Sequence, residues 1–185
     1  GLHYIPQISN ETNDEVYFQF YHGDYQKAVD KAKSLISGRQ KCDEVPHLTN
    51  GVLALVFWQL GNAEAAAERF KKGYKLTQGK AEFLNANADF IQYLTASEQW
   101  QEAEKVAQAE LKVLPASENK FRQFRLYAAI AILLQTAHKQ GVAMDVGMGL
   151  QAALQHAQQA AAAFDERNGN TYYQQQLATQ LAAYA

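Results

Sequence analysis

Apolar residues recur along much of this chain at intervals of three and four, the spacing that collects them on one face of an α-helix. The clearest case lies between positions 53 and 76, where a Gly61-Asn62 corner separates two such stretches. Glycine ends helices readily, and asparagine caps the helix that follows. The pattern therefore predicts two helices joined by a tight turn. Their inward stripes are Leu53, Phe57 and Leu60 before the corner, and Ala66, Phe70, Gly73 and Leu76 after it.

Weaker copies of this pattern stand on both sides of it. Gly23-Asp24 and Glu98-Gln99 occupy the position of the central corner, and an alanine follows the first corner residue after five positions each time. These alanines are Ala28, Ala66 and Ala103, spaced 38 and 37 residues apart. A pair of short helices cannot bury its own apolar face, so several such pairs must pack on one another. The sequence predicts a stack of helix pairs in which the three alanines are one structural site.

The repeat resembles the tetratricopeptide (TPR) family. The first helix of the central unit has a small residue, Ala54, and an aromatic one three positions later, Phe57. Ala66 and Phe70 follow the corner, and Pro115 closes the third unit. The resemblance implies an all-α fold: a right-handed α-solenoid of antiparallel helix hairpins, with about four units and a C-terminal capping helix.

The chain divides into three predicted segments. Residues 1–10 contain a proline and no periodicity, and we expect an extended N-terminal arm there. Residues 11–168 form the TPR-like repeat domain, whose fourth unit departs from the pattern through a glycine-punctuated link at 141–149. Residues 170–185 are expected to form the capping helix, with one apolar face made of Tyr173, Leu177, Leu181 and Tyr184.

The composition of the chain excludes several classes of protein but does not identify the function. Apolar residues make up 48% of the chain and charged residues 19%, which is typical of a folded soluble protein. A formal net charge of −2 gives no basic footprint for nucleic acid. No apolar run approaches the roughly 18 residues of a membrane-spanning helix, so we expect no membrane insertion. The single cysteine, Cys42, excludes an internal disulfide framework. The compartment stays open between the cytoplasm and, where a leader preceded Gly1, an extracytoplasmic space.

Catalytic and metal-binding motifs are missing from the sequence. The five histidines are scattered, with no pair at i and i+4. Gly79-Lys80 lacks the other residues of a phosphate-binding loop. Cys42 and His47 fall in a charged loop without a candidate oxyanion hole, which favours a surface thiol over a nucleophile. We therefore expect no enzymatic activity, no cofactor and no metal.

The resemblance also implies a concave groove lined by the first helix of each unit, where a partner segment binds. Aromatic rings beside amides suit an extended peptide or a partner helix. For Tyr17 and Trp58 the alternative is packing between adjacent hairpins. Transfer by register gives ten groove residues: Tyr17, Phe20 and Tyr21 in the first unit, Leu55, Trp58 and Gln59 in the second, Asp89 and Gln92 in the third, and Gln135 and His138 in the fourth.

The expected function is a non-enzymatic scaffold that binds a protein or peptide partner. Two alternatives stand beside it. In the first, the chain has a structural role and forms a homodimer through the apolar capping helix, with Leu181 and Tyr184 at the contact. In the second, the chain is the sensor or regulatory segment of a longer protein, and the link at 141–149 is its moving element.

Overall fold

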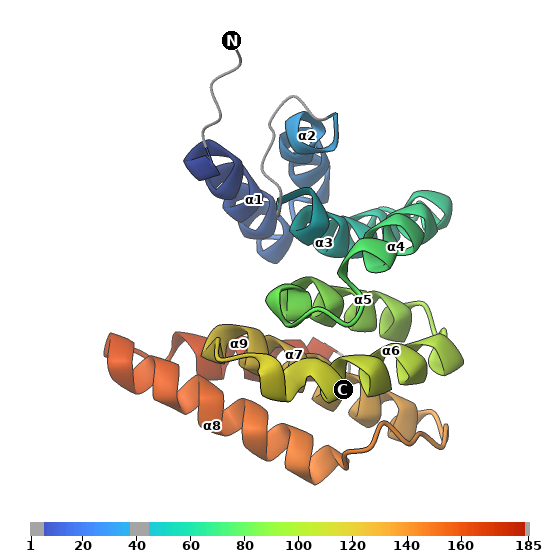
Figure 1. The fold of residues 1–185 in the computed structure, drawn as a ribbon, viewed down its shortest axis with the longest axis vertical. Coiled ribbons are helices and arrows are strands. Elements are labelled where there is room, and N and C mark those ends of the chain that lie inside the picture. The colour runs from blue at the N-terminus through green and yellow to red at the C-terminus, as the bar shows by residue number, and fades with distance from the viewer. Residues whose placement is uncertain (1–5, 38–44, 184–185) are drawn as a thin grey trace. The chain divides into compact units, whose positions relative to one another are not determined.

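The computed structural model describes residues 6–37 and 45–183, and every regular element in that part of the chain is a helix (Figure 1). The prediction of an all-α fold is confirmed. Short 3-10 turns lie before α5, at Ala81–Phe83, and after α6, at Leu114–Ala116. The α-helices are α1 (Pro6–Tyr21), α2 (Tyr25–Ile36), α3 (Val45–Gln59), α4 (Ala63–Thr77), α5 (Leu84–Ala96), α6 (Trp100–Val113), α7 (Lys120–Lys139), α8 (Leu150–Asn168) and α9 (Tyr172–Ala183).

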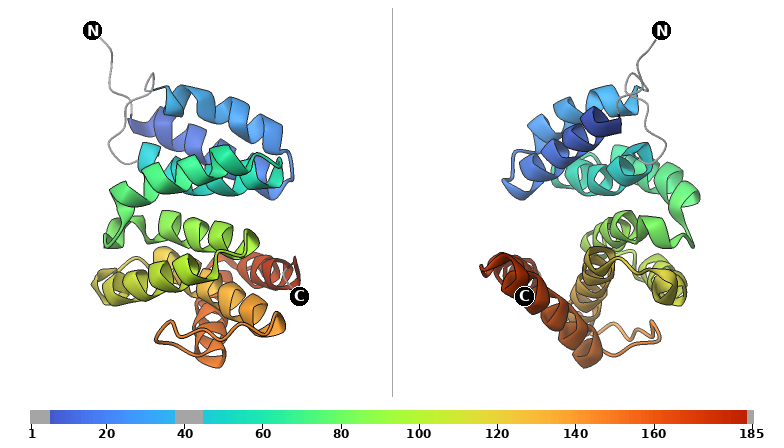
Figure 2. Two further views of the ribbon diagram at one scale, coloured as in Figure 1. Left: turned by 90° about the vertical axis from the view of Figure 1, so that its right-hand side faces the viewer. Right: turned by 60° about the vertical axis from the view of Figure 1, so that its left-hand side comes forward.

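The helices form two compact units, Gly1–Thr77 and Gln78–Ala185. In the first unit α1 packs against α2, both of them contact α3, and α3 packs against α4 (Figure 2). Its core consists of small and branched side chains from α1, α2 and α3. Within α2 and α3 these residues recur after three or four positions, as expected for one face of a helix. These core residues are Val16, Ala28, Ala32, Val52, Leu53 and Val56, with Tyr17, Phe20, Tyr25, Val29 and Phe57 half-buried around them.

The second unit is organised around α5 and α7, which pack directly against each other. Helix α6 packs against α5, α8 packs against α7, and α9 packs against α8 (Figure 1). Between Ala86 and Thr95 no residue of α5 is more than 7% exposed. Within this unit α6 and α7 cover α5 from two sides, and α7 joins it to α8 and α9.

One kind of turn ends five helices in the described part of the chain. In each turn a residue with positive φ donates its N–H to the carbonyl three residues back, and the next N–H donates to the carbonyl five residues back. At Gly61 the φ angle is 75° and these two bonds measure 3.0 and 2.9 Å. This is the Schellman turn, which satisfies the last carbonyls of a helix and favours glycine. The positive-φ residues are Gly23, Gly61, Glu98, Gly141 and Gly169.

The alanine of the repeat has the same place after three of these turns. Ala28, Ala66 and Ala103 are each the fourth residue of their helix and 0% exposed. The N–H group of each alanine donates to the carbonyl of the residue four positions earlier, which is the second residue of the corner, at 2.9 to 3.0 Å. The prediction of a shared structural site is confirmed in position and burial. Ala153, the fourth residue of α8, repeats it with 0% exposure and a 3.0 Å bond to Gly149.

The structure corrects three expectations about local structure. Helix α1 begins at Pro6, so residues 6–10 are helical instead of extended, and residues 1–5 lie outside the described residues. Proline suits a first helical turn, where its missing N–H would have no partner. Helix α3 begins at Val45, inside the expected loop, and Cys42 lies outside the described residues. Leu60 and Leu76 are both 42% exposed, because they stand at the ends of their stripes, where the helices terminate.

The link between α7 and α8 is fastened to α6. The N–H of Asp145 donates to the Glu104 carboxylate at 2.9 Å, and the side-chain amide of Gln108 donates to the Asp145 carbonyl at 2.5 Å. Val146 is 2% exposed. These contacts hold the link in place and argue against its role as a moving element. The single repeat domain expected over residues 11–168 stays a prediction.

Glu98 occupies, with a φ of 58°, the position that the other four turns give to glycine. A side chain in the left-handed region costs about 1 kcal/mol. We predict that the free energy of unfolding of Glu98→Gly exceeds that of Glu98→Ala by about 1 kcal/mol. Both variants lose the exposed hydrogen bond from Gln140 to Glu98, so the comparison isolates the backbone term. Urea unfolding followed by far-UV circular dichroism measures the difference, and equal stabilities would contradict it.

Candidate partner-binding surfaces

The ten expected groove residues lie on α1, α3, α5 and α7, in unequal surroundings. Three of them are almost fully buried: Leu55 and Asp89 are 2% exposed and Gln92 is 7% exposed. Their assignment to a binding groove is corrected, because such side chains present almost no surface to a partner. For the other seven, binding stays a prediction. Tyr17, Phe20, Trp58 and Gln135 are half-buried, and Tyr21, Gln59 and His138 are exposed.

Asp89 belongs to a buried ion pair instead of a binding surface. Its carboxylate accepts a hydrogen bond from the guanidinium of Arg125, which is 6% exposed, so paired charges join α5 to α7. A second buried acid, Glu110, is 0% exposed and accepts bonds from the Asn87 amide at 2.8 Å and from the N–H of Gly79 at 3.2 Å. Buried charges need such partners. These polar side chains position helices within the second unit.

Gln135 ties α7 to the capping helix α9. Its amide donates to the carbonyl of Leu181 at 3.0 Å, and Leu181 itself packs half-buried against the aromatic and alanine cluster of this unit. Leu181, which we expected at the dimer contact of the capping helix, therefore packs into its own unit. Tyr184 lies outside the described residues. Dimerisation through the capping helix stays a prediction.

Asp165 of α8 holds the beginning of α9. Its carboxylate accepts the N–H groups of Tyr173 and Gln174 at 2.8 and 2.9 Å and the side-chain amide of Gln174 at 3.0 Å. Burial by itself would raise the pKa of Asp165, but these hydrogen bonds hold that pKa below its usual range. The ionised carboxylate satisfies amide groups that a helix start otherwise leaves without a partner.

The outward face of α1 carries the most exposed aromatic side chain in the described part of the first unit. Phe18 is 56% exposed and Tyr21 is 39% exposed, three residues apart and therefore on one face. The Phe18 ring packs on His22 with centroids 4.0 Å apart. Tyr17 and Phe20 pack half-buried against the core of the unit, and the Tyr21 ring contacts both of theirs, with centroids 6.3 and 5.3 Å away. Sequence reasoning missed Phe18, although an aromatic residue out of phase with the buried stripe was a signal for it.

Two carboxylates continue this face toward the beginning of the helix. Glu11 and Asp14 lie seven and four residues before Phe18, so the four residues Glu11, Asp14, Phe18 and Tyr21 form one line, which we name the α1 stripe. Burial raises the pKa of Asp14 above its usual range, and the charge of Glu11 adds to the rise. Lys31 pairs with Glu15 at 2.9 Å, and among the described residues no cation pairs with Glu11 or Asp14. The stripe is therefore acidic at one end and aromatic at the other.

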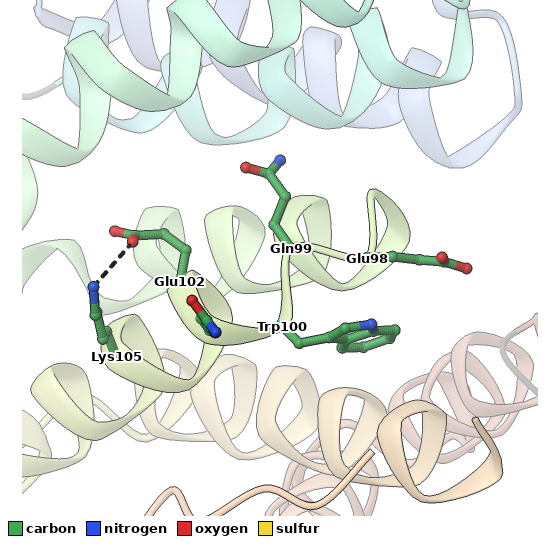
Figure 3. Close-up of a pocket in the computed structure, with 6 residues that line it drawn as sticks. Glu98, Gln99, Trp100, Glu102 and Lys105 are labelled. Carbon is green, nitrogen blue, oxygen red and sulfur yellow. Dashed lines mark ion pairs between the residues drawn. The ribbon is translucent and has the colours of Figure 1, made fainter. Parts of the chain in front are cut away.

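A polar hollow of about 440 Å³ lies at the beginning of α6 (Figure 3). Glu102 and Lys105 form an ion pair of 3.8 Å on one side of it, and the Trp100 ring extends away from them. The Gln99 amide donates to the Tyr93 hydroxyl at 3.2 Å and to Ser97 at 2.8 Å. Because Gln99, Glu102 and Lys105 already have polar partners, this hollow offers a binding partner fewer hydrogen bonds than its composition suggests.

The chain matches no protein-family model, and neither a curated protein nor a solved structure is significantly similar to it. Within the described residues, no helix is long and apolar enough to cross a membrane. The same residues contain no group of three or more histidine, cysteine, aspartate or glutamate side chains placed to hold a metal ion.

The buried pair of Asp89 and Arg125 leads to a prediction about stability. Arg125→Met removes the positive charge beside a buried carboxylate, and we predict a loss of about 3–5 kcal/mol in the free energy of unfolding of the second unit. In the double variant Asp89→Leu/Arg125→Met most of that loss is recovered, since no charge remains buried. Urea unfolding in a Trp58→Phe background makes Trp100 the only tryptophan, so its fluorescence reports on this unit.

The matched control is Lys105→Met, which breaks an exposed ion pair whose lysine side chain is 74% exposed. It should change the free energy of unfolding by less than about 1 kcal/mol. A loss in Arg125→Met no larger than in this control would show that the pair does not hold α5 to α7.

Proposed function

We propose that this protein is a non-enzymatic interaction module that binds a segment of a protein partner on the α1 stripe. In this proposal the helices form a TPR-like, right-handed α-solenoid of about four antiparallel hairpins with a capping helix. The observation that carries the binding role is the exposure of Phe18 and Tyr21 on one face of α1, at 56% and 39%.

Repetition within the structure supports the solenoid. One kind of turn and one buried alanine position recur from α2 to α8, in both units. A solenoid is built from a supersecondary element that cannot bury its face alone and therefore stacks on copies of itself. The packing of α3 on both α1 and α2, and of α7 on α5, is of this kind.

The surface chemistry of α1 supports binding. Burial of a large apolar side chain stabilises by about 1.5–3 kcal/mol, and aromatic residues dominate the energetics of protein interfaces. Tyr17 and Phe20 already supply the aromatic packing of α1 against the core. Phe18 is therefore not required to hold the unit together, and its exposed ring is available to a partner.

The charge of the stripe indicates the class of partner. Burial raises the pKa of Asp14 and the nearby charge of Glu11 adds to the rise, so a cation from a partner would stabilise both carboxylates. The complementary segment carries an apolar side chain for Phe18 and Tyr21 and basic side chains about two helical turns away. A short amphipathic helix with lysine or arginine at one end has this pattern.

The test compares the wild-type chain with the double variant Phe18→Ser/Tyr21→Ser as bait for proteins from the native lysate, with quantitative mass spectrometry. We expect the amount of partner bound to fall at least about tenfold with the variant, since the loss of even one hot-spot aromatic contact costs about 1.4 kcal/mol or more. Circular dichroism checks that the helix content is unchanged, because Phe18 and Tyr21 lie outside the core.

The matched control is Leu60→Ser/Leu76→Ser, which removes two equally exposed apolar residues, each 42% exposed, from the same unit. Partners should remain bound to this control. If the α1 variant and the control retain the same proteins in the same amounts, the α1 stripe is not the binding surface. A second arm, Glu11→Gln/Asp14→Asn, should weaken the salt dependence of the same interaction.

A further inference from the structure

Five aromatic rings meet in the second unit where α7 begins, α8 ends and α9 begins. Phe124 is 2% exposed, and its ring lies edge-on to Phe164 and Tyr173, with centroids 6.3 and 5.7 Å away. Phe121 is one turn earlier on α7 and lies edge-on to the same two rings at 6.4 and 6.3 Å. Tyr172 completes the group with its ring 5.2 Å from that of Tyr173. Edge-to-face contacts at these distances are favourable.

The two outer rings of this cluster are exposed to solvent. Phe121 is 39% exposed and Tyr172 is 55% exposed, and in the described part of the second unit these are the large apolar residues with the greatest exposure. Both contact the ring of Tyr173, so the exposed aromatic surface of the unit is concentrated at one place. A concentrated apolar patch rimmed by polar groups is typical of a binding site.

A hollow of about 390 Å³ opens on this patch. Its lining combines the Phe121, Phe164 and Tyr173 rings with two cationic side chains, Lys120 and Arg167. Such a volume is at the small end for a binding pocket and accommodates one aromatic side chain with its neighbour. Asp165 follows the lining residue Phe164 in sequence, but its carboxylate binds the N–H groups at the start of α9 and forms no ion pair with Lys120 or Arg167 within the described residues.

The two cations have neutral partners only. The Lys120 ammonium donates to the Gln123 side chain at 3.3 Å, and the Arg167 guanidinium donates to Asn168 at 3.2 Å and lies 5.3 Å from the centre of the Phe164 ring. Within the described residues neither forms an ion pair. The N-terminal end of α7 adds a partial positive charge at the same place, with Asn119 as its cap.

We infer that this hollow, which we name the aromatic–cationic pocket, binds a peptide segment in which an acidic residue flanks an aromatic one. The aromatic side chain of the ligand packs on Phe121 and Tyr173, and its neighbouring carboxylate accepts hydrogen bonds from Lys120 and Arg167. Apolar rings alone would select any aromatic residue, and the two cations add the requirement for a negative charge. The pocket shares no residue with the α1 stripe and prefers the opposite charge.

The inference is tested with two unlabelled peptides and NMR titration of the ¹⁵N-labelled full chain. One probe is a blocked peptide of sequence Gly-Glu-Phe-Glu-Gly, and the other replaces both glutamates by glutamine. We expect the acidic peptide to bind at least about tenfold more tightly at low salt, with the largest amide shifts at Lys120, Asn168 and Tyr173. The preference should shrink as ionic strength rises, because the charges are partly exposed.

Variants separate the two halves of the site. Lys120→Gln/Arg167→Gln should bind both peptides with equal affinity, whereas Phe121→Ala should lose affinity for both. The matched control Lys112→Gln/Lys139→Gln removes two exposed lysines from α6 and α7 outside the pocket and should retain the tenfold preference. All four cations are on the surface, so folding of these variants is checked by their unchanged NMR spectra.

Three results would overturn the inference: equal affinity of the wild-type chain for both peptides, an undiminished preference in Lys120→Gln/Arg167→Gln, or amide shifts confined to other parts of the chain. The Phe18→Ser/Tyr21→Ser variant should bind the acidic peptide as the wild-type chain does. The pocket is thus tested independently of the α1 stripe, and either proposal can fail alone.

Discussion

This structure depends on the close approach of two helices at a buried alanine. A left-handed turn just before the second helix places that alanine. After Gly23, Gly61 and Glu98 the next helix starts within two residues, and its fourth residue is an alanine with no exposed surface. Protein interiors are close-packed, so a larger side chain there would push the helices apart. Turn and alanine act together, because the turn sets where the second helix begins and the alanine sets how near it comes.

What that packing leaves on the outside determines what the protein can bind. On α1 the inward face takes Tyr17 and Phe20, and the aromatic residue between them in sequence, Phe18, is left on the solvent side. In the second unit, Phe124 fills the core while Phe121, one turn earlier, remains at the surface. The two outward surfaces differ in charge: carboxylates flank the first, and a lysine and an arginine line the second. They therefore suit partner segments of opposite character.

The sequence predicted the fold more completely than the site. Helix periodicity and the recurrent corner are local signals, and they located the helix pairs and the shared alanine position. Ala153 was missed because the link before α8 changes the spacing, and the helical start at Pro6 was missed because proline also suits an extended arm. The groove was transferred by register from a resemblance, and register says nothing about burial. Asp89 is paired inside its unit, a tertiary contact across 36 residues that no local pattern encodes. Phe18 is out of phase with the buried Val16, but the pattern alone does not tell how much of its ring stays exposed.

The most direct test of this account compares Ala66→Leu with Ala67→Leu in a Trp100→Phe background, where Trp58 alone reports on the first unit. The two positions are adjacent on α4, and the first is fully buried while the second is exposed. The account predicts that Ala66→Leu lowers the free energy of unfolding in urea by about 1–3 kcal/mol. Ala67→Leu should change it by less than about 0.5 kcal/mol. Equal stabilities of the two variants would contradict the central role of the alanine.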